Sequence, residues 1–593
     1  MSSSKFDELL AQLGTGKWNY LCFFAVAYWN MHLVPHTLAG AFLAPKVEYT
    51  CHPPEEGYTV TSTVINERDG TIWNDTNQCQ FLAKSMDNGE GFVPHVCGSW
   101  VYDNSTYTNT ITSEFDLVCT NEYLRATYQS MYMFGTFVGA PLNGMLADRF
   151  GRKTMLSIGT IFYSLIAIGS SWIPDFSAIL VSRFILGLMH PVGLQTGYIL
   201  AMEVCEPRYR SVLGIIIGLP WALATMLWGG MAYFIRDWRW LQMAVSLSGV
   251  FFIPVLWFLD ESPRWLIVEG RFERANKVLR RAAKWNKVTL PPQAELNTLM
   301  RTIQKESAFA KRQTMQDQEE ASGCRERILY YIKRLFILFR TPKLCKITII
   351  MYLKFLLVSM VFYGLALNAV NYSADPFVYM VLGGLAEVPA YSITAPIVAA
   401  FGRRVPSILL YFLSGATILG VSFISPVEPR LYPPPRSKSS SPDIRFPGIE
   451  DINLSPKAYI GPSVPPNLSW LVMTLAMVGK MCISAAFQVL YLYCSELFPT
   501  EVRLQALGSA TIASRIGSMT SPFITEVLGP IYPRAPSILF GIAAFVAGIA
   551  TIPLHETLGR PLPDTITDLE NPQVVQAESD EPDEEVEMAK LRA

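Results

Sequence analysis

Twelve stretches of mainly apolar residues recur along the chain, and polar segments of unequal length separate them. The stretches cover about 18–40, 124–146, 154–174, 176–202, 211–234, 240–259, 346–367, 376–400, 405–425, 469–494, 506–530 and 534–554. Each is roughly 20 residues long, which is the length that an α-helix needs to cross the apolar core of a bilayer. The pattern therefore predicts an all-α membrane protein with twelve transmembrane helices.

Three short polar signatures occur twice, in the same order and after corresponding apolar stretches. The first set comprises 144–153, Glu203 with Arg210, and 260–264; the second comprises 401–404, Glu496 with Arg503, and 555–560. In both sets the glutamate precedes the arginine by seven residues. This repetition predicts two bundles of six helices, an arrangement that secondary transporters use to hold a substrate between the repeats.

Basic residues gather in the loops on one side of the predicted membrane. The 260–345 loop alone carries 18 Lys and Arg against 10 Asp and Glu. Because short basic loops face the cytoplasm, we expect a cell-membrane protein with both termini cytoplasmic. The expected parts are a cytoplasmic N-terminus (1–17), an N-terminal bundle (18–259) with an extracellular loop (41–122), a cytoplasmic loop (260–345), a C-terminal bundle (346–555) with an extracellular insert (426–467), and a cytoplasmic acidic tail (556–593).

Composition excludes several classes of protein. Hydrophobic residues make up 50% and charged residues 16%, whereas soluble proteins carry roughly a quarter charged residues. The net charge is −1 and no basic stripe is interleaved with aromatics, so we expect no nucleic-acid partner. The sequence has no Gly-x4-Gly-Lys-Ser/Thr, His-Glu-x-x-His or Gly-x-Ser-x-Gly motif. We therefore expect neither an enzyme nor a cofactor or metal site.

The polar 41–122 loop has the features of an extracellular region. It contains 12 acidic and 3 basic residues, and four of the ten cysteines: Cys51, Cys79, Cys97 and Cys119. Four cysteines in such a loop favour two disulfide bonds, with three pairings open. A zinc site is the alternative, although no two of these cysteines are two to four residues apart. Expected glycosylation sites are Asn74 and Asn104 here, and Asn371 and Asn453 in two other outer loops.

Two further polar segments have unusual compositions. The 426–467 insert contains 11 prolines in 42 residues, which predicts extended chain without a packed core. The C-terminal tail ends in a run of acidic residues. We interpret it either as a solvated tail or as a docking segment for a cytosolic adaptor.

Several motifs resemble those of a known family. Segment 144–153 resembles the loop signature between helices 2 and 3 of the major facilitator superfamily, and 260–266 its signature after helix 6, with Asp260 where proline is usual. Segments 100–119, 232–239, 363–365, 387–391, 496–500 and 562–566 are similar to organic cation, organic anion and carnitine transporters. The resemblance spans about residues 18–570 and implies the major facilitator fold. The long 426–467 insert and segment 189–192 depart from it.

Three ionisable residues lie deep inside apolar stretches of the C-terminal half. Glu387, Arg515 and Lys480 are about 16, 14 and 17 Å into their helices at 1.5 Å per residue. Because such a group costs roughly 2.5–3.5 kcal/mol at mid-bilayer, it normally faces a cavity or a partner. In one interpretation Glu387 attracts a substrate ammonium group and Arg515 binds a carboxylate. In the other, Glu387 pairs with Arg515 or Lys480 only to neutralise charge, or Lys480 snorkels away.

Uncharged residues could complete the substrate site. Phe362 and Tyr363 lie where the resemblance implies substrate-contacting aromatics, and their rings suit cation–π contacts; ordinary helix packing is the alternative. Gln195 is a weaker polar candidate. His32 and His36 are four residues apart and could relay protons, although a structural role is the simpler interpretation.

The repeated charges at helix ends suggest a cytoplasmic gate. The candidates are Asp148, Arg149, Gly151, Arg152, Glu203, Arg210, Glu261, Arg264, Arg403, Glu496 and Arg503. Solvated charges, or charges matched to helix dipoles, are the alternative.

These features predict alternating-access transport of small organic ions across a lipid bilayer, with or without a coupling ion. Among the proteins that the chain resembles, a cavity acid accompanies organic cations, and an arginine in helix 11 accompanies organic anions or carnitine-like zwitterions. Segments 479–480 and 514–518 look most like the carnitine branch. We therefore expect organic cations or carnitine-like zwitterionic amines. Organic anion exchange and a non-transporting, receptor-like membrane protein are the alternatives.

Overall fold

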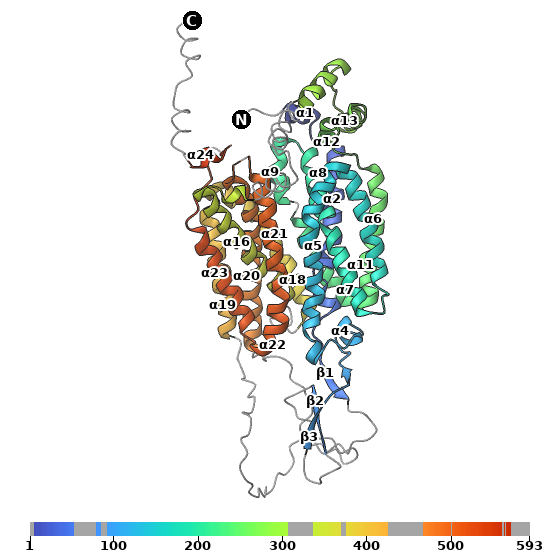
Figure 1. Cartoon of the computed structure of the whole chain (residues 1–593), viewed down its shortest axis with the longest axis vertical. Coiled ribbons are helices and arrows are strands. Elements are labelled where there is room, and N and C mark those ends of the chain that lie inside the picture. Colours follow the sequence, from blue (N-terminus) through green and yellow to red (C-terminus); the bar gives the residue numbers. More distant parts are fainter. Residues whose placement is uncertain are drawn as a thin grey trace, which may run out of the picture.

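The computed structural model describes residues 5–52, 79–84, 92–216, 218–305, 336–368, 375–424, 466–499, 501–559, 563 and 565–570. Most of these residues form long helices that run roughly side by side (Figure 1). In the N-terminal half the helices are α1 (Lys5–Leu13), α2 (Lys17–Thr37), α3 (Gly40–Leu43), α4 (Ile111–Glu114), η1 (Cys119–Asn121), α5 (Tyr123–Phe150), α6 (Arg152–Ser170), α7 (Phe176–Pro191), η2 (Val192–Thr196), α8 (Gly197–Val204), η3 (Pro207–Tyr209), α9 (Arg210–Ile216), α10 (Leu219–Phe234), α11 (Trp238–Phe258), α12 (Pro263–Val268) and α13 (Phe272–Asn286).

The C-terminal half repeats the pattern of long helices. Its elements are η4 (Ile337–Phe339), α16 (Pro342–Leu367), α18 (Pro376–Phe401), α19 (Arg404–Ile424), α20 (Pro466–Leu497), α21 (Arg503–Phe523), η5 (Ile524–Leu528), α22 (Gly529–Ile531), α23 (Ala535–Thr551) and α24 (Ile566–Glu570). All twelve predicted stretches coincide with helices, with ends that differ by a few residues. The fourth stretch is interrupted by the π-helical turn η2, and the eleventh ends in a second one, η5.

Seven helical segments of the described chain are long and apolar enough to cross a membrane. They are Arg152–Ser170, Phe176–Val204, Trp238–Phe258, Pro342–Leu367, Pro376–Phe401, Arg404–Ile424 and Trp470–Leu497. Helices α2, α5 and α21 contain more polar side chains, such as Asn30, Gln129 and Ser514, and these are buried. Polar side chains in membrane helices normally face the interior of the bundle. The lower hydropathy of these helices therefore fits inward-facing positions.

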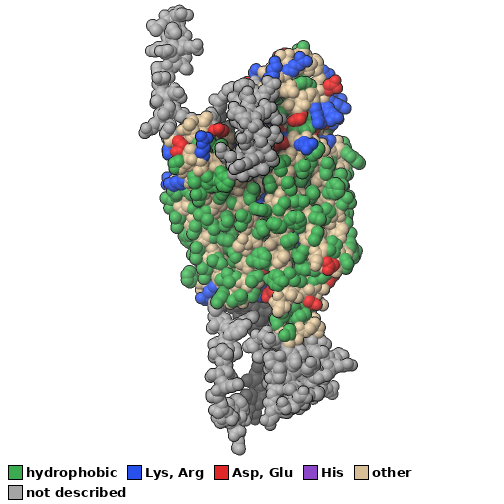
Figure 2. Space-filling model, viewed as in Figure 1, with side chains coloured by type: hydrophobic (Ala, Val, Ile, Leu, Met, Phe, Trp, Pro, Cys, Tyr) green, Lys and Arg blue, Asp and Glu red, His purple; other side chains and the backbone are tan. Residues whose placement is uncertain are grey.

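The helices form two bundles that meet along two helix pairs. Helix α5 packs on α7, and α6 on α11, within the N-terminal bundle; α16 packs on α21, and α19 on α20 and α23, within the C-terminal bundle. Between the bundles, α5 packs on α21 and α10 on α18. Exposed apolar side chains form a broad band across the helices on the face that Figure 2 shows. This confirms the predicted all-α membrane architecture of two six-helix bundles.

The two ends of the molecule differ. One end, here called the basic end, carries α1, α12, α13 and α24 with clustered Lys and Arg (Figures 1 and 2). The amphipathic helix α1 buries Phe6 and Leu10 there, and Asp260 joins two elements by accepting hydrogen bonds from Trp18 and Arg281. Asp260, the departure from the usual proline, thus ties α2 to α13.

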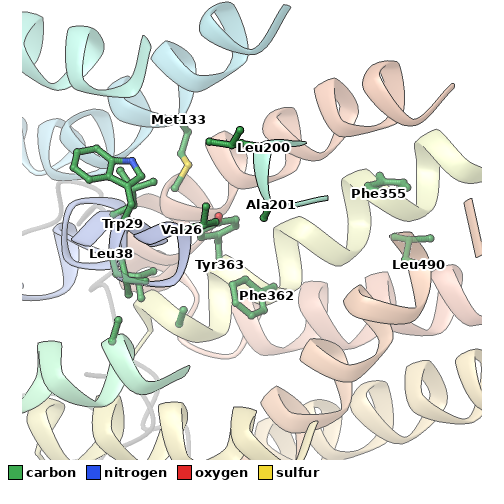
Figure 3. Close-up of a cluster of buried hydrophobic side chains, with 14 of the residues drawn as sticks. Val26, Trp29, Leu38, Met133, Leu200, Ala201, Phe355, Phe362, Tyr363 and Leu490 are labelled. Atoms are coloured by element: carbon green, nitrogen blue, oxygen red, sulfur yellow. The ribbon is translucent and has the colours of Figure 1, made fainter. Parts of the chain in front are cut away.

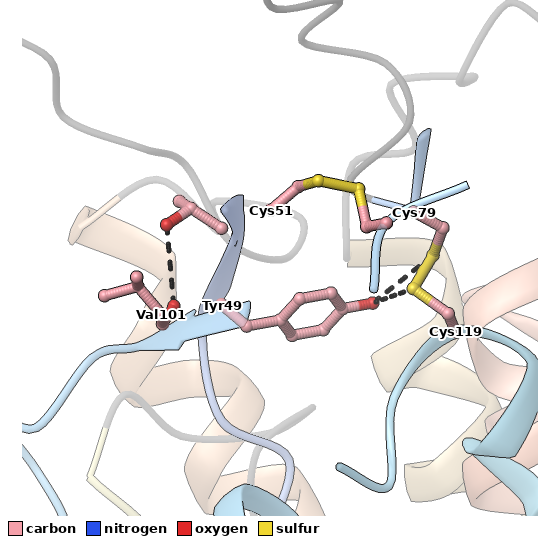
Figure 4. The surroundings of a disulfide bond; sticks show 7 residues. Tyr49, Cys51, Cys79, Val101 and Cys119 are labelled. Atoms are coloured by element: carbon pink, nitrogen blue, oxygen red, sulfur yellow. Dashed lines mark hydrogen bonds between the residues drawn. A yellow bond between two sulfur atoms is a disulfide. The ribbon is translucent and has the colours of Figure 1, made fainter. Parts of the chain in front are cut away.

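The opposite end, here called the strand end, carries two small sheets that the all-α prediction did not include. Strands β1 (Tyr49–His52) and β4 (Ser99–Tyr102) pair antiparallel, as do β2 (Gln80–Lys84) and β3 (Phe92–Val96). The predicted disulfides are confirmed, with Cys51 bonded to Cys97 and Cys79 to Cys119. The Tyr49 hydroxyl lies 3.8 and 3.7 Å from the two sulfurs of the second bond (Figure 4).

Several sequence predictions concern residues outside the described chain. Asn74, Asn371 and Asn453, nearly all of the Pro-rich insert and most of the acidic tail belong to this group. Asn104 is described, and it is exposed directly after β4. Its position is therefore open to a glycan.

The disulfide pairing can be tested by thiol labelling at the cell surface. Cys79→Ser should leave Cys119 as a free thiol that a membrane-impermeant maleimide labels on intact cells. The wild type should label weakly, because its described free cysteines are buried or, like Cys345, lie near the basic end. The matched Cys79→Ser/Cys119→Ser double variant should lose the extra label. Wild-type labelling as strong as that of the single variant would contradict the pairing.

Candidate functional site

A buried ion pair lies inside the C-terminal bundle. Lys480 Nζ on α20 is 3.4 Å from Glu387 Oε1 on α18, with side chains 0% and 1% exposed. Gly383 makes this approach possible, because a Cβ at that position would lie 2.5 Å from Lys480 Nζ. Glu387 thus forms a neutralising ion pair, which was one of the two interpretations of the sequence, and its partner is Lys480. The second carboxylate oxygen of Glu387, Oε2, has no hydrogen-bond partner among the described residues.

Arg515 is separate from this pair. It lies on α21, which packs against α5 of the other bundle, and it is 8% exposed. Its guanidinium lies close enough to interact electrostatically with Tyr363 of α16 and with His190 of α7 in the N-terminal bundle. In the described part of the chain no Asp or Glu lies within ion-pair distance of it, and its Nε has no partner. Arg515 is therefore a buried cation at the interface between the bundles.

Aromatic side chains surround this interface. The Phe362 ring lies edge-on to Tyr363 at 5.3 Å and 5.7 Å from Phe487, while Trp221 of α10 is 6.5 Å away across the interface. Phe362 and Tyr363 belong to one buried cluster that also contains Val26 and Trp29 of the N-terminal bundle (Figure 3). Phe362 and Tyr363 therefore lie near the bundle interface, and their contact with a substrate stays a prediction. Gln195 is half-buried in the π-turn η2.

Sequence reasoning missed three buried polar groups at similar depth. Lys354 on α16 is fully buried, with Nζ 5.3 and 5.2 Å from the ring centres of Tyr411 and Tyr493. Arg183 lies between two tyrosine rings of α5, and His190 bonds to one of them. The criterion that identified Glu387, an ionisable residue inside an apolar stretch, applies equally to Lys354 and Arg183 and would have found both.

At the basic end, the N-terminal bundle joins α5 and α6 through a short turn, here called the N-terminal joint (residues 147–154). Gly151 adopts φ +101°, and a Cβ there would lie 2.5 Å from the Glu261 carboxylate. Glu261 accepts hydrogen bonds from the backbone N–H of Lys153 (2.8 Å) and Thr154 (3.3 Å). Arg152 pairs with Asp148 at 2.9 Å and with Glu203 at 3.3 Å.

The C-terminal bundle repeats this construction between α18 and α19, here called the C-terminal joint (residues 398–404). Gly402 adopts φ +85°, and a Cβ there would lie 2.5 Å from the carboxylate of Glu556. Glu556 accepts the backbone N–H of Arg403 (2.8 Å) and Arg404 (2.9 Å). Arg403 pairs with Glu496 at 2.8 Å. Glu556, which we had not included among the gate residues, therefore corresponds to Glu261.

The electrostatics of Glu556 reflect these donors. Partial burial raises the pKa of its carboxyl, but backbone N–H groups of Arg403, Arg404, Leu558 and Thr557 lower it more, so that the pKa lies below its ordinary value. A depressed carboxyl pKa gives stability that is present at neutral pH and is lost as the pH falls through the depressed value. The C-terminal joint is therefore fully formed at physiological pH.

Four other predicted gate residues take no part in the ion pairs of the two joints. Arg210 pairs with Asp7 of α1 at 2.6 Å rather than with Glu203. Arg149 is exposed and stacks on Phe150, and Arg264 stacks on Phe6. Arg503 donates a hydrogen bond to a backbone carbonyl, that of Phe498. The glutamate and the arginine that are seven residues apart therefore lie at corresponding helix ends in the two halves. They do not form an ion pair with each other in either half.

Contacts between the bundles gather at the strand end. Arg125 of α5, whose side chain is 3% exposed, pairs with Glu526 of η5 at 2.8 Å. Ser130 donates a hydrogen bond of 2.8 Å to the Met519 carbonyl. Phe377 at the start of α18 stacks on Phe42 at 5.3 Å and lies 5.6 Å from Tyr107. The Arg125–Glu526 ion pair joins the two bundles here, so this conformation is closed at the strand end.

Comparison with solved structures supports the fold. The partially occluded inward open conformation of the xylose transporter XylE from E. coli matches with a TM-score of 0.55 and 13% identity, over 92% of this chain and 100% of that one. The XylE structure bound to 6-bromo-6-deoxy-D-glucose, a major facilitator superfamily protein, matches with a TM-score of 0.54 and 14% identity, over 93% and 98%.

Sequence comparison identifies the family. A family model described as sugar (and other) transporter matches residues 96–428. Organic anion transporter 3 of Sus scrofa is 30% identical over 598 residues, with 99% of this chain and 97% of that protein covered. The organic cation transporter protein of Drosophila melanogaster is 28% identical over 581 residues, covering 95% and 94%. The chain therefore belongs to the sugar (and other) transporter family, a family of transporters and not of enzymes, and shares its fold with the XylE structures.

Proposed function

We propose that this protein is a cell-membrane transporter of small organic ions whose substrates carry a carboxylate that Arg515 binds. The proposal depends on which of the buried charged side chains have a partner of opposite charge. Lys480 neutralises Glu387, whereas Arg515 has no carboxylate partner in the described chain. A buried arginine without an anion is costly, and its planar fork suits a carboxylate.

Zwitterionic amines, including carnitine-like compounds, are the substrates that we favour. Support comes from the free Oε2 of Glu387 and from the Phe362 and Tyr363 rings, which together could receive an ammonium group. Organic anions are the second candidate, because with Glu387 paired the net charge of Glu387, Lys480 and Arg515 is positive. A simple quaternary cation fits the site least well. Uptake of a quaternary cation, carnitine and a dicarboxylate, each with and without sodium, would separate these classes and detect a sodium-coupled mechanism.

Orientation follows from the two ends. We place the strand end outside the cell, because its two disulfides suit an oxidising compartment. The basic end and both termini are then cytoplasmic, in line with the positive-inside rule. In this orientation the structure represents a conformation closed toward the outside.

The two joints act as the cytoplasmic gate in this proposal. In each bundle an arginine of the joint forms an ion pair with a glutamate at the end of another helix. This glutamate is Glu203 in the first bundle and Glu496 in the second. Each joint lies wholly within its own bundle, so it can move with that bundle as a unit. Alternating access requires such rigid units to rock around a central site.

The carboxylate assignment can be tested with Arg515→Gln. Affinity for a zwitterion should fall about 10- to 100-fold, because a charge-assisted hydrogen bond is worth roughly 1.5–3 kcal/mol. Any uptake of a quaternary cation should change far less at matched surface expression. Lys354→Gln removes a buried cation outside the site and serves as the matched control. Equal losses for both substrates in Arg515→Gln would make Arg515 a structural residue and refute the assignment.

The gate proposal can be tested with Arg152→Gln and Arg403→Gln. Both variants should lower the maximal rate of uptake more than the amount of protein at the surface, because the joints would no longer move as units. Arg208→Gln changes an exposed arginine of η3 outside both joints and should leave the rate unchanged. Proportional losses of transport and surface protein in the two joint variants would show a role in folding alone.

A further inference from the structure

A network of buried histidine and tyrosine side chains crosses the N-terminal bundle and is not explained by the substrate site. His32, His36 and His190 are 4%, 0% and 2% exposed. Tyr132 joins His190 Nδ1 at 2.8 Å to the Tyr163 hydroxyl at 2.9 Å. These residues come from α2, α5, α6 and α7, so four helices contribute to one buried polar path.

His36 is the histidine of the network whose ring makes the fewest hydrogen bonds. Neither of its ring nitrogens has a hydrogen-bond partner in the described chain. Its ring centre lies 5.3 Å from that of Tyr163 and 5.2 Å from that of His32. Leaving a buried polar group unpaired costs roughly 1–3 kcal/mol, and an apolar side chain would fill this space without that cost. Packing alone therefore does not account for an imidazole here.

The network leads from the outer side toward the substrate site. His36 is one residue before the end of α2 at the strand end, whereas His190 lies about 21 Å along α7 at 1.5 Å per residue. His190 interacts with the charge of Arg515 in the other bundle, and Tyr132 lies close enough to Tyr363 to interact electrostatically. The inner end of the network thus meets the residues proposed to bind the substrate carboxylate.

The charged groups that face the histidines are both cationic. Arg183 on α7 donates a hydrogen bond of 2.9 Å to the His36 carbonyl, and Arg515 on α21 faces His190. The other titratable groups around the network are tyrosines: Tyr128 and Tyr132 on α5, Tyr163 on α6 and Tyr363 on α16. Ser248 of α11 contributes a hydroxyl to His32. Among these described neighbours there is no carboxylate that could neutralise a protonated imidazole.

We propose that this histidine–tyrosine network binds a proton that is transported together with the substrate carboxylate. The proposal rests on the proposed function. A proton here adds a positive charge to a region that already holds Arg183 and Arg515, so it is unfavourable in the closed, empty protein. A carboxylate at Arg515 offsets this charge. Proton and carboxylate therefore bind cooperatively, since linkage makes such coupling reciprocal.

No covalent bond of the substrate changes in this step. The proton moves from extracellular water to an imidazole nitrogen while the outer side is open. It leaves for cytoplasmic water after the bundles have rocked and the carboxylate has departed. The Tyr132 hydroxyl links His190 to the Tyr163 hydroxyl, because a hydroxyl both donates and accepts a hydrogen bond. The Tyr163 ring in turn lies edge-on to the rings of His32 and His36, with centroids 5.6 and 5.3 Å away.

The test measures uptake of carnitine and of a dicarboxylate at an extracellular pH of about 7.5 and about 5.5, a range across which histidine titrates. Wild-type uptake of at least one should rise on acidification, by up to about tenfold per pH unit, the limit for one linked proton. His190→Gln should abolish the rise. Tyr163→Phe, which keeps the ring and removes only the linking hydroxyl, should reduce it. His52→Gln, in β1 outside the network, is the matched control and should keep it.

Two outcomes separate this inference from the proposed function. Wild-type carboxylate uptake that does not respond to pH, or a response that His190→Gln retains, overturns the proton site and leaves transport intact. If surface-expressed protein transports no substrate at any pH, the proposed function is wrong. The proton site is then tested by a measurement that needs no substrate.

That measurement uses Ser130→Cys, at a position buried between the bundles at the strand end. Its labelling by an impermeant thiol reagent reports opening toward the outside. Labelling at low pH, compared with Ser130→Cys/His190→Gln under the same conditions, should be higher in the parent, because a buried proton disfavours closure. Equal labelling of the two proteins at each pH would overturn the proton site.

Discussion

The cost of an uncompensated charge in apolar surroundings determines where the polar side chains of this protein lie. Glu387 and Lys480 meet because each would otherwise be buried alone, and Gly383 leaves the space for their approach. Arg183 lies between two tyrosine rings, and Lys354 faces two others. Only Arg515 combines a position at the bundle interface with the lack of a described carboxylate partner. These two properties together are why we propose that a substrate carboxylate binds at Arg515, and not at Lys354 or Arg183.

The two halves obey a second constraint at their basic ends, where backbone N–H groups would otherwise be unpaired. A glutamate that follows the last helix of each bundle accepts two consecutive N–H groups at the turn between the second and third helices. A glycine with positive φ leaves room for that carboxylate in both cases. The same geometry in both halves connects helices that are far apart in sequence, and it explains why the charged signatures recur in the same order.

Much of the fold could be predicted from the sequence, because apolar length and basic loops act locally. The twelve helices and the presence of disulfides follow from such patterns, whereas Phe362 and Tyr363 became candidates only through the family resemblance. The pairing Cys51–Cys97 depends on β1 lying beside β4, which no local pattern reveals. The partner of Arg210 is Asp7, about 200 residues earlier in the chain. Choices among several partners depend on three-dimensional approach, so the sequence left open whether Glu387 would pair with Lys480 or with Arg515.

The strand-end region is fastened almost entirely to one bundle. Glu114 holds Trp238 and Arg239 at the start of α11, and the Thr108 N–H bonds to the Arg236 carbonyl, while Cys119 leads directly into α5. Its described aromatic contact with the other bundle is Tyr107 on Phe377. An antibody or nanobody bound to the exposed residues around the buried Tyr107 would therefore be attached to the N-terminal bundle while lying beside its contact with the other bundle. In the proposed orientation, such a reagent would act from outside the cell, and it would stabilise one relative position of the two bundles without entering the proposed substrate site.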